Sequence, residues 1–196
     1  IIKCILSRGF ELLVLTNAMK PMRRHEAALM TLRQEHGARL TLRVSLDHYR
    51  ADIHEAERGQ GTWAPALDGL HWLGSHGFSI AVAGRLLADE TEAEARAGYA
   101  ALFAKQAIAV DANDSNRLVL FPEMDARADI PEISTDCWHI LGKAPGQVMC
   151  ASSRMVVHRK GEPEPRVAAC TLLPYEPGFD MGASLREAMS PVRLNH

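Results

Sequence analysis

The sequence predicts an α/β fold in which part of a (β/α) TIM-like barrel, with parallel strands inside and helices outside, is followed by a small C-terminal β-hairpin extension. Strand-like and helix-like segments alternate along the first two thirds of the chain. Two successive strands carry aliphatic residues on one face and small or polar residues on the other. Two β-prone runs then flank a short turn rich in Gly and Pro.

The first strand is expected at residues 10–16, a short apolar run that lies between Gly9 and Asn17. The stretch 1–9 before it resembles the end of a helix. Pro21 is expected to begin a helix that Gly37 ends.

The second strand is expected at residues 40–47, where aliphatic and polar residues alternate. Thr62 is a candidate N-cap for the helix that follows. The third strand is expected at residues 78–85, and Thr91 with Glu94 forms a capping-box pattern for the next helix. The fourth strand is expected at residues 116–121, before Pro122.

The alternation in the second and third strands favours a barrel over an open sheet. In a barrel, the aliphatic face meets the helices and the other face lines the interior. A doubly wound sheet is covered on both sides and makes both faces apolar. We therefore expect residues 1–124 to form a partial barrel.

The composition changes after Met124 and predicts two further regions. Residues 125–147 are rich in Asp, Pro and Gly and are expected to be a linker. Residues 148–196 are expected to hold the hairpin and a truncated C-terminal region. A simple register pairs His158 with Arg166 across the charged turn at residues 161–165.

Composition and charge exclude several classes of protein. With 22 Lys and Arg against 24 Asp and Glu, the net charge is −2, which gives no basic surface for a nucleic acid partner. No apolar run approaches the ~20 residues that cross a bilayer, so no membrane partner is expected. Four cysteines at this chain length predict reduced thiols in a cytoplasmic protein.

Polar residues follow the expected strands at one edge of the sheet, where parallel barrels place their active sites. Together they offer hydroxyl, amide, carboxylate and guanidinium groups that suit an amino acid zwitterion and a ribose. The candidate binding residues are Thr16, Asn17, Ser45, Asp47 and Arg85. The alternative is structural, with Ser45 and Asp47 capping the next turn and Arg85 pairing with a surface acid.

The strand ends Thr16-Asn17, Ser45-Leu46-Asp47 and Gly84-Arg85, in this order and spacing, resemble the middle strands of radical S-adenosylmethionine enzymes. The likeness is strongest to members that carry a SPASM- or twitch-type C-terminal extension, and it covers nearly the whole chain.

The resemblance implies a role for each matched position. Thr16 and Asn17 would lie near the methionyl group of S-adenosylmethionine. Ser45 and Asp47 would contact its carboxylate or ribose, and Arg85 is a candidate for the carboxylate. The strand that holds Leu120 and Phe121 would pack on the adenine.

The resemblance also implies a 4Fe-4S cluster and an electron donor protein, but the chain departs from the family pattern. The family holds its cluster with C-x-x-x-C-x-x-C, which is absent here, as is the Gly-Gly-Glu-Pro motif. The chain is therefore expected to be an internal fragment that cannot cleave S-adenosylmethionine alone.

Two cysteines of the expected hairpin, Cys150 and Cys170, resemble ligands of a SPASM-type auxiliary iron–sulfur cluster. The alternative is that they are buried structural thiols. With His158 opposite Arg166, Arg154 lies level with Cys170 and Cys150 is four residues away, about 13 Å along a strand. Shared ligation therefore requires the chain to bend back near Cys150.

These patterns predict a radical enzyme in which a 5′-deoxyadenosyl radical abstracts hydrogen from a substrate, and the extension suggests a peptide substrate. Two alternatives remain open. One is a non-catalytic binding or scaffold protein on a degenerate barrel. The other is an unrelated α/β enzyme that binds a phosphorylated or carboxylated metabolite.

Overall fold

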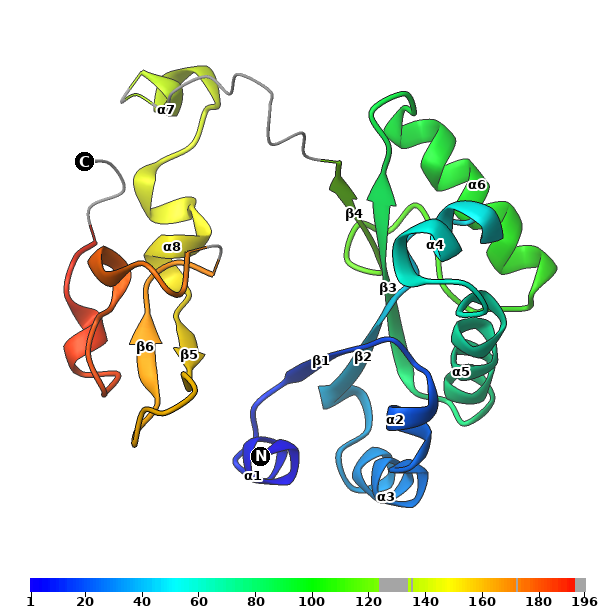
Figure 1. Cartoon of the computed structure of the whole chain (residues 1–196), viewed down its shortest axis with the longest axis horizontal. Coiled ribbons are helices and arrows are strands. Elements are labelled where there is room, and N and C mark those ends of the chain that lie inside the picture. The colour runs from blue at the N-terminus through cyan, green and yellow to red at the C-terminus, as the bar shows by residue number, and fades with distance from the viewer. Residues whose placement is uncertain (124–133, 135, 172, 193–196) are drawn as a thin grey trace. The chain divides into compact units, whose positions relative to one another are not determined.

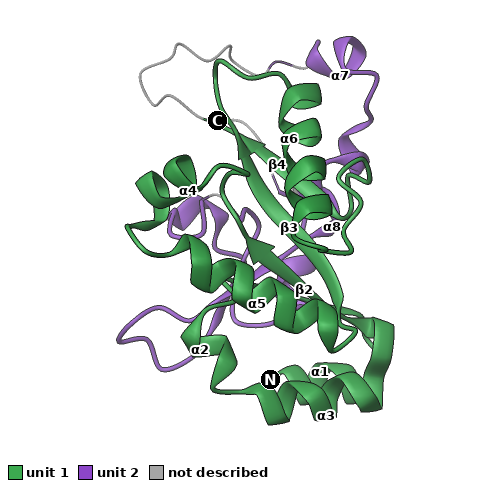
Figure 2. Cartoon of the chain, turned by 90° about the vertical axis from the view of Figure 1, so that its right-hand side faces the viewer, with its two compact units in different colours: residues 1–127 green, residues 128–196 purple. Residues whose placement is uncertain are grey.

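A computed structural model of the chain describes residues 1–123, 134, 136–171 and 173–192, apart from the side chain of Cys150. The chain divides into two compact units, Ile1–Arg127 and Ala128–His196, which Figure 2 shows in different colours. They are called unit 1 and unit 2 below, and each is described by itself.

Unit 1 contains a parallel sheet whose strands follow one another in chain order. Its strands are β1 (Leu12–Thr16), β2 (Leu40–Ser45), β3 (Ser79–Leu86) and β4 (Leu118–Pro122). The register sets Thr16 beside Val44, Ser45 beside Ala83, and Arg85 beside Phe121. The predicted parallel α/β arrangement is therefore confirmed, and all four strands end at the same edge.

The helices of unit 1 connect these strands. They are α1 (Ile2–Ser7), α2 (Lys20–Arg23), α3 (Glu26–His36), the 3-10 turn η1 (Gly37–Arg39), α4 (Ala51–Arg58), α5 (Trp63–Ser75) and α6 (Glu92–Lys105). Figure 1 shows α2 to α6 on one side of the sheet. Parallel crossovers are right-handed, so strands added in one direction place all their helices on the same face.

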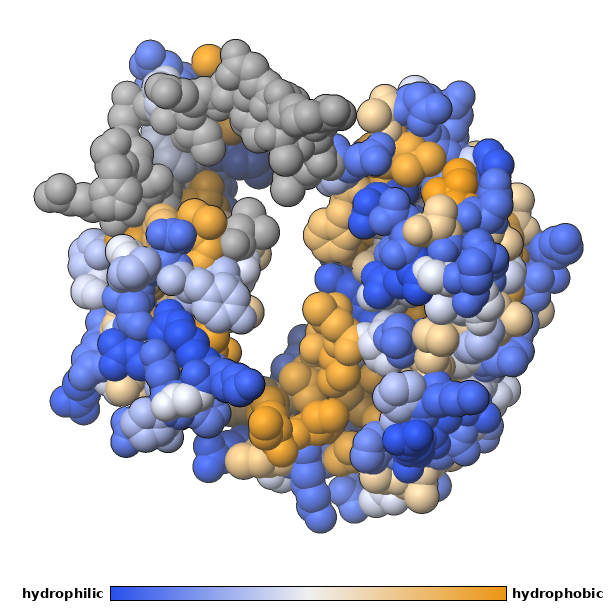
Figure 3. All heavy atoms as spheres, in the orientation of Figure 1, coloured by the Kyte–Doolittle hydropathy of each residue, from blue (hydrophilic) through white to orange (hydrophobic). Residues whose placement is uncertain are grey.

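The two faces of the sheet differ as the alternation predicted. On the helix side, β2 buries Leu40, Leu42 and Val44, each at most 1% exposed. On the other side, Leu15 of β1 and Phe121 of β4 are 68% and 55% exposed. Figure 3 shows hydrophobic atoms gathered over β1. We call this second side the open face, because no helix in the described part of unit 1 packs on it.

Unit 1 differs from the sequence expectations at three places. The helix expected after Pro21 is split at His25, whose N–H donates to the carbonyl of Met22 in a tighter turn. Thr62 is the N-cap residue of α5, as expected, but its hydroxyl donates to the carbonyl of Gly59 (2.6 Å) and makes no capping hydrogen bond. The carboxylate of Glu55 accepts from the N–H of Trp63 instead (3.2 Å). Finally, α4 was not predicted at all.

Other local expectations are confirmed. The segment before β1 contains α1, as its resemblance to a helix end suggested. Thr91 and Glu94 form the expected capping box at the start of α6. The fourth strand exists, but its bounds were wrong, because β4 begins at Leu118 and includes Pro122 rather than ending before it.

Unit 2 is built around a short antiparallel hairpin, which confirms the expected extension. Its elements are α7 (Cys137–Ile140), η2 (Pro145–Gln147), α8 (Met149–Ser152), β5 (Met155–Val157), β6 (Arg166–Ala168), η3 (Pro177–Phe179) and η4 (Glu187–Met189). Val157, rather than His158, pairs with Arg166, so the expected register was wrong by one residue. The side chain of Arg159 bonds Asp180 and the carbonyl of Pro174, which draws the chain out of the strand after Val157.

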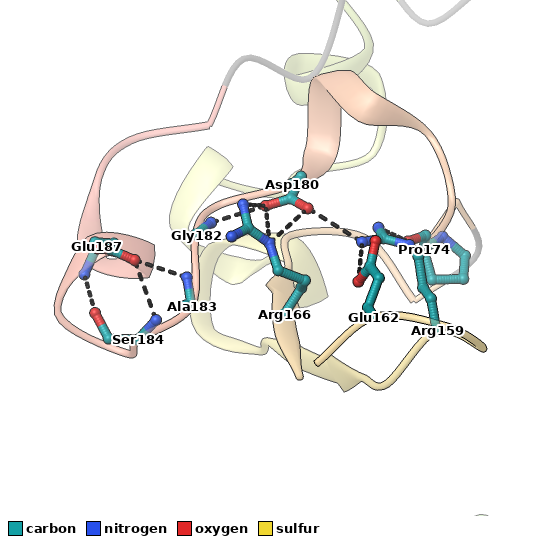
Figure 4. A network of polar contacts seen from close by, with 9 residues as sticks. All are labelled: Arg159, Glu162, Arg166, Pro174, Asp180, Gly182, Ala183, Ser184 and Glu187. Carbon is teal, nitrogen blue, oxygen red and sulfur yellow. Dashed lines mark hydrogen bonds and ion pairs between the residues drawn. The ribbon is translucent and has the colours of Figure 1, made fainter. Parts of the chain in front are cut away.

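Asp180 joins the segments of unit 2 (Figure 4). Its carboxylate accepts hydrogen bonds from Arg166 at 2.7 Å, from Arg159 at 3.2 Å and from the N–H of Gly182 at 2.9 Å. The Arg166 hydrogen bonds, followed by that of Gly182, hold the pKa of the Asp180 carboxyl well below its usual range. The half-buried carboxylate of Asp180 therefore links the hairpin to the segment that follows it.

Among the described residues, no helix is long and apolar enough to cross a membrane.

Candidate functional site

A pocket of about 240 Å³ lies on the open face of unit 1, at the carboxyl ends of the strands. Its lining includes residues from all four strands and one from α4. The lining residues are Leu15, Arg43, Ser45, Asp47, Arg58, Ala83, Gly84, Arg85 and Phe121. We call it the strand-end pocket. Such an edge is where parallel α/β proteins bind their ligands.

Three of the five predicted binding residues, Ser45, Asp47 and Arg85, line this pocket. They lie at the carboxyl ends of β2 and β3, which are close together because the two strands are parallel neighbours in the sheet. Phe121, the residue assigned by resemblance to an adenine-packing strand, is also part of the lining. Ser45 is half-buried, and its hydroxyl has no hydrogen-bond partner among the described residues.

Thr16 and Asn17 lie at the end of β1 but are not part of the pocket lining. The Thr16 hydroxyl accepts from the N–H of Ala18 at 3.0 Å, and the Asn17 side chain accepts from the N–H of Met19 at 3.1 Å. Thr16 pairs with Val44, on the helix side of the sheet. Both side chains therefore hold the turn after β1, in which Ala18 adopts a positive φ of 57°.

Asp47 forms a bidentate ion pair with Arg58 of α4. The guanidinium donates from Nε to Oδ2 at 2.7 Å and from Nη2 to Oδ1 at 2.9 Å. These hydrogen bonds raise the pKa of Arg58 above its ordinary value. The backbone N–H of Asp47 donates to Nδ1 of the buried His54 at 3.2 Å. Arg58 therefore balances the charge of the Asp47 carboxylate within the pocket. Hydrogen bonds hold both the side chain and the backbone of Asp47 in position.

Arg85 of β3 also lines the pocket. Its Nη1 is 3.0 Å from Oε2 of Glu57, and its backbone N–H donates to the carbonyl of Asp47 at 2.8 Å. Beside it, Gly84 packs directly on the buried ring of Tyr99, whose hydroxyl donates to the carbonyl of Leu46 at 2.7 Å. A side chain at residue 84 would displace this ring, so the glycine keeps β3 close to α6.

Sequence reasoning missed two arginines of the strand-end pocket, Arg43 and Arg58. Arg43 lies in the middle of β2, on the open face. An arginine inside a strand of a parallel sheet is itself a signal, because charged residues are rarely placed there without a partner. Arg58 ends α4, a helix that was not predicted, and nothing in its local pattern connects it with Asp47.

A second polar cluster in unit 1 consists of His48, Tyr49 and Glu90. The hydroxyl of Tyr49 donates to Oε1 of Glu90 at 2.7 Å, and Nε2 of His48 is 3.5 Å from Oε2 of the same carboxylate. The backbone N–H of Arg50 donates to Nδ1 of His48 at 3.1 Å. Since Nδ1 accepts, a neutral His48 carries its proton on Nε2, facing Glu90.

His48 and His54 are each 1% exposed and are both expected to be neutral in the folded protein. Burial lowers the pKa of both below the ordinary value of 6.5, and for His48 it outweighs the opposing effect of Glu90. The unfolded chain therefore binds protons more readily than the folded one. Their contribution to stability is complete above pH 6.5 and is lost as the pH falls towards the folded-state pKa.

We expect the free energy of unfolding to decrease between pH 7 and pH 5, and His48→Gln to weaken that dependence. Urea unfolding at a series of pH values measures it. His25→Gln is the matched control, because His25 is exposed and its side chain forms no hydrogen bond or ion pair in the described part of unit 1. An identical pH dependence in wild type and His48→Gln would contradict this assignment.

The described cysteine side chains lie apart from one another and from other metal-ligating groups. Among the described residues there is no group of three or more His, Cys, Asp or Glu side chains that could hold a metal ion. Cys4 is exposed, while Cys137 and Cys170 are half-buried free thiols. The described side chains therefore do not fit a cluster held by three neighbouring thiolates.

Cys150 and Cys170, the predicted auxiliary ligands, both lie in unit 2. The side chain of Cys150 is outside the described residues, but its backbone belongs to α8, which ends just before β5. Continuing the observed register places Ser153, rather than Arg154, level with Cys170. The helical turn shortens the path between Cys150 and the hairpin, since a helix rises 1.5 Å per residue against about 3.3 Å for a strand.

Comparison with known proteins finds no matching family model, no matching curated protein and no matching solved structure.

Proposed function

We propose that the chain is part of a radical S-adenosylmethionine enzyme and that the strand-end pocket binds S-adenosylmethionine. The single observation that carries the proposal is the convergence of Ser45, Asp47 and Arg85 with Phe121 in one pocket. The first three belong to the ends of two strands that are about 40 residues apart in the sequence. The resemblance implies that all four residues contact S-adenosylmethionine.

The fold supports the proposal in a second way. Strands in consecutive order with helices on one side are the arrangement of a (β/α) barrel, whose interior is lined by the other face. In the proposed protein, further strands would close the barrel over the open face. The exposed side chains of Leu15 and Phe121 would then lie inside it.

The chemistry of the pocket suits the proposed ligand. Phe121 and Leu15 offer apolar surface to a flat base, and aromatic rings stack well on such surfaces. The hydroxyl of Ser45 is available to a carboxylate or ribose. Arginine side chains provide charge for the methionyl carboxylate.

The proposal is limited to binding for this chain. The sequence contains no C-x-x-x-C-x-x-C, so the electron for cleavage, its donor protein and the site of radical formation are not assigned to these residues. Cys150 and Cys170 are proposed as two ligands of an auxiliary cluster, and a peptide remains the proposed substrate class. The helical turn α8 supports the proposal for Cys150 and Cys170, because it bends the chain near Cys150, as ligation of one cluster by both cysteines requires.

Equilibrium dialysis of S-adenosylmethionine against the 196-residue chain tests the binding proposal. We expect saturable binding that Ser45→Ala weakens about fivefold, the equivalent of one net hydrogen bond. Thr41→Val is the matched control, since Thr41 lies on the same face of β2 but outside the pocket lining. No saturable binding, or equal weakening by both substitutions, would contradict the proposal.

A second candidate function is supported by the three arginines of the pocket. Three guanidinium groups around 240 Å³ also suit a phosphorylated or carboxylated metabolite of an unrelated α/β enzyme. Inorganic phosphate distinguishes the two in the same dialysis experiment. Tight phosphate binding that excludes S-adenosylmethionine would favour this second function.

A further inference from the structure

The three arginines of the strand-end pocket are not equivalent. Arg58 is held by both oxygens of Asp47, and Arg85 is held by Glu57. Arg43 has no ion pair and no hydrogen bond in the described part of the chain. Its Nε is buried and without a hydrogen-bond partner. The pocket therefore contains one cation whose charge the protein does not balance.

The position of Arg43 explains why no neighbour balances it. On β1 its register partner is Leu15, and on β3 it is Ala81. Neither side chain can accept a hydrogen bond. The carboxylate of the pocket lining, Asp47, already accepts from Arg58 with both oxygens. Arg43 is therefore left without a carboxylate partner in the pocket lining.

The neighbours of Arg43 also leave room beside it. Ala81 and Ala83 on β3 are small, and Ser45 is the next residue of β2 on the same face. A ligand that enters between Leu15 and Phe121 can therefore reach the guanidinium. A partly buried guanidinium without a partner costs free energy, and a carboxylate that forms two parallel hydrogen bonds with it recovers that cost.

We propose that Arg43 is the residue of this pocket that binds the carboxylate of its ligand, in place of Arg85. The site would take a small organic molecule that has one carboxylate and an apolar or aromatic part. The identity of this molecule rests on the proposed function. The carboxylate can belong to the methionyl group of S-adenosylmethionine or to the substrate that binds beside it.

Two ligands separate these sources. S-adenosylmethionine has the carboxylate, whereas 5′-methylthioadenosine has the same nucleoside and no carboxylate. We expect Arg43→Gln to weaken S-adenosylmethionine binding at least tenfold and to change 5′-methylthioadenosine binding less than twofold. Arg43→Lys keeps the charge but not the planar fork, and should fall between wild type and Arg43→Gln. Arg24→Gln, at an exposed arginine of unit 1, should change neither affinity.

Acetate tests the same inference without S-adenosylmethionine. The Nε–H signal of Arg43, assigned by its loss in Arg43→Gln, should shift saturably with sodium acetate and not with sodium chloride at equal ionic strength. If acetate acts on Arg43 while S-adenosylmethionine affinity is independent of it, the carboxylate belongs to the substrate. If neither the acetate shift nor the affinity depends on Arg43, the inference is wrong.

The two proposals can fail separately. If the wild type binds no S-adenosylmethionine, the proposed function is wrong, and the acetate shift still decides the role of Arg43. If the wild type binds S-adenosylmethionine but acetate leaves Arg43 unchanged and Arg43→Gln binds normally, only the present inference is wrong. Circular dichroism of each variant checks that it folds. Removing an unbalanced buried charge should not lower its melting temperature.

Discussion

Gly69→Ala is expected to destabilise unit 1 by about 3 kcal/mol or more, because the added methyl group would clash with the turn after β1. A Cβ at Gly69 would overlap the carbonyl oxygen of Ala18 and lie 2.6 Å from its Cβ. Ala18 is fully buried and has a positive φ, so the turn after β1 cannot move aside cheaply. The contact between Gly69 and Ala18 thus packs α5 directly against the end of β1, where Thr16 and Asn17 lie.

Gly74→Ala is the control for this substitution. Gly74 lies on the same helix, and a Cβ there would meet only Cδ1 of Ile80, at 3.9 Å. Replacing a glycine inside a helix with alanine should leave stability unchanged or raise it by up to about 1 kcal/mol. Urea unfolding of both variants measures the difference, and equal stabilities would show that α5 does not pack on this turn.

Asp180→Asn is expected to have the second largest effect, confined to unit 2. The amide would keep one acceptor but lose the charge that faces Arg166 and Arg159, and Arg166 would be left without its carboxylate (Figure 4). The hairpin strands are only three residues long, so the ion pairs of Asp180 are a large share of the contacts between the hairpin and the segment that follows it. We expect the melting temperature of unit 2 to fall by about 5 to 10 °C.

The sign of the pH dependence provides a further check on Asp180. Arg166 and Gly182 lower the folded-state pKa of the Asp180 carboxyl. Its contribution to the free energy of unfolding is therefore present above the ordinary carboxyl pKa and is lost only in strong acid. Glu164→Gln is the matched control, because Glu164 is exposed and forms no ion pair within the described part of unit 2. Hydrogen exchange at Val167 and Ala169 follows unit 2 by itself. Unchanged protection in Asp180→Asn would contradict the role given to this carboxylate.

Most of unit 1 could be predicted because its strands and long helices have clear periodicity. Leu40, Leu42 and Val44 alternate with polar residues, and both the strand and its buried face followed from that pattern. The helix α4 was missed because half of its residues are charged, and its buried His54 resembles a solvated residue. Its place is decided by contacts with Asp47 and Trp63 that the local sequence does not reveal.

The same distinction applies to the strand-end pocket. Ser45, Asp47 and Arg85 were found because the ends of parallel strands meet, a rule that needs only the positions of the strands. The partners Arg58 and Glu57 come from α4 and depend on how the chain returns to the sheet. Thr16 and Asn17 satisfy the same rule, yet their side chains hold their own turn, since short polar residues often bond the backbone two residues on.

The hairpin shows how register depends on tertiary contacts. The sequence gives two β-prone runs and a turn, and several registers satisfy that pattern. The ion pairs of Arg159 and Arg166 with Asp180 come from a segment more than ten residues further along the chain. They select the register in which Val157 faces Arg166.

An amide chemical-shift titration of the ¹⁵N-labelled chain with S-adenosylmethionine tests the proposed binding at the strand-end pocket of unit 1. We expect saturable shifts at Leu15, Ser45, Gly84 and Phe121. The signals of Gly77 and Ser79, at the opposite end of the sheet, should not change. Shifts confined to other residues, or no saturable shift at millimolar ligand, would contradict the proposed binding.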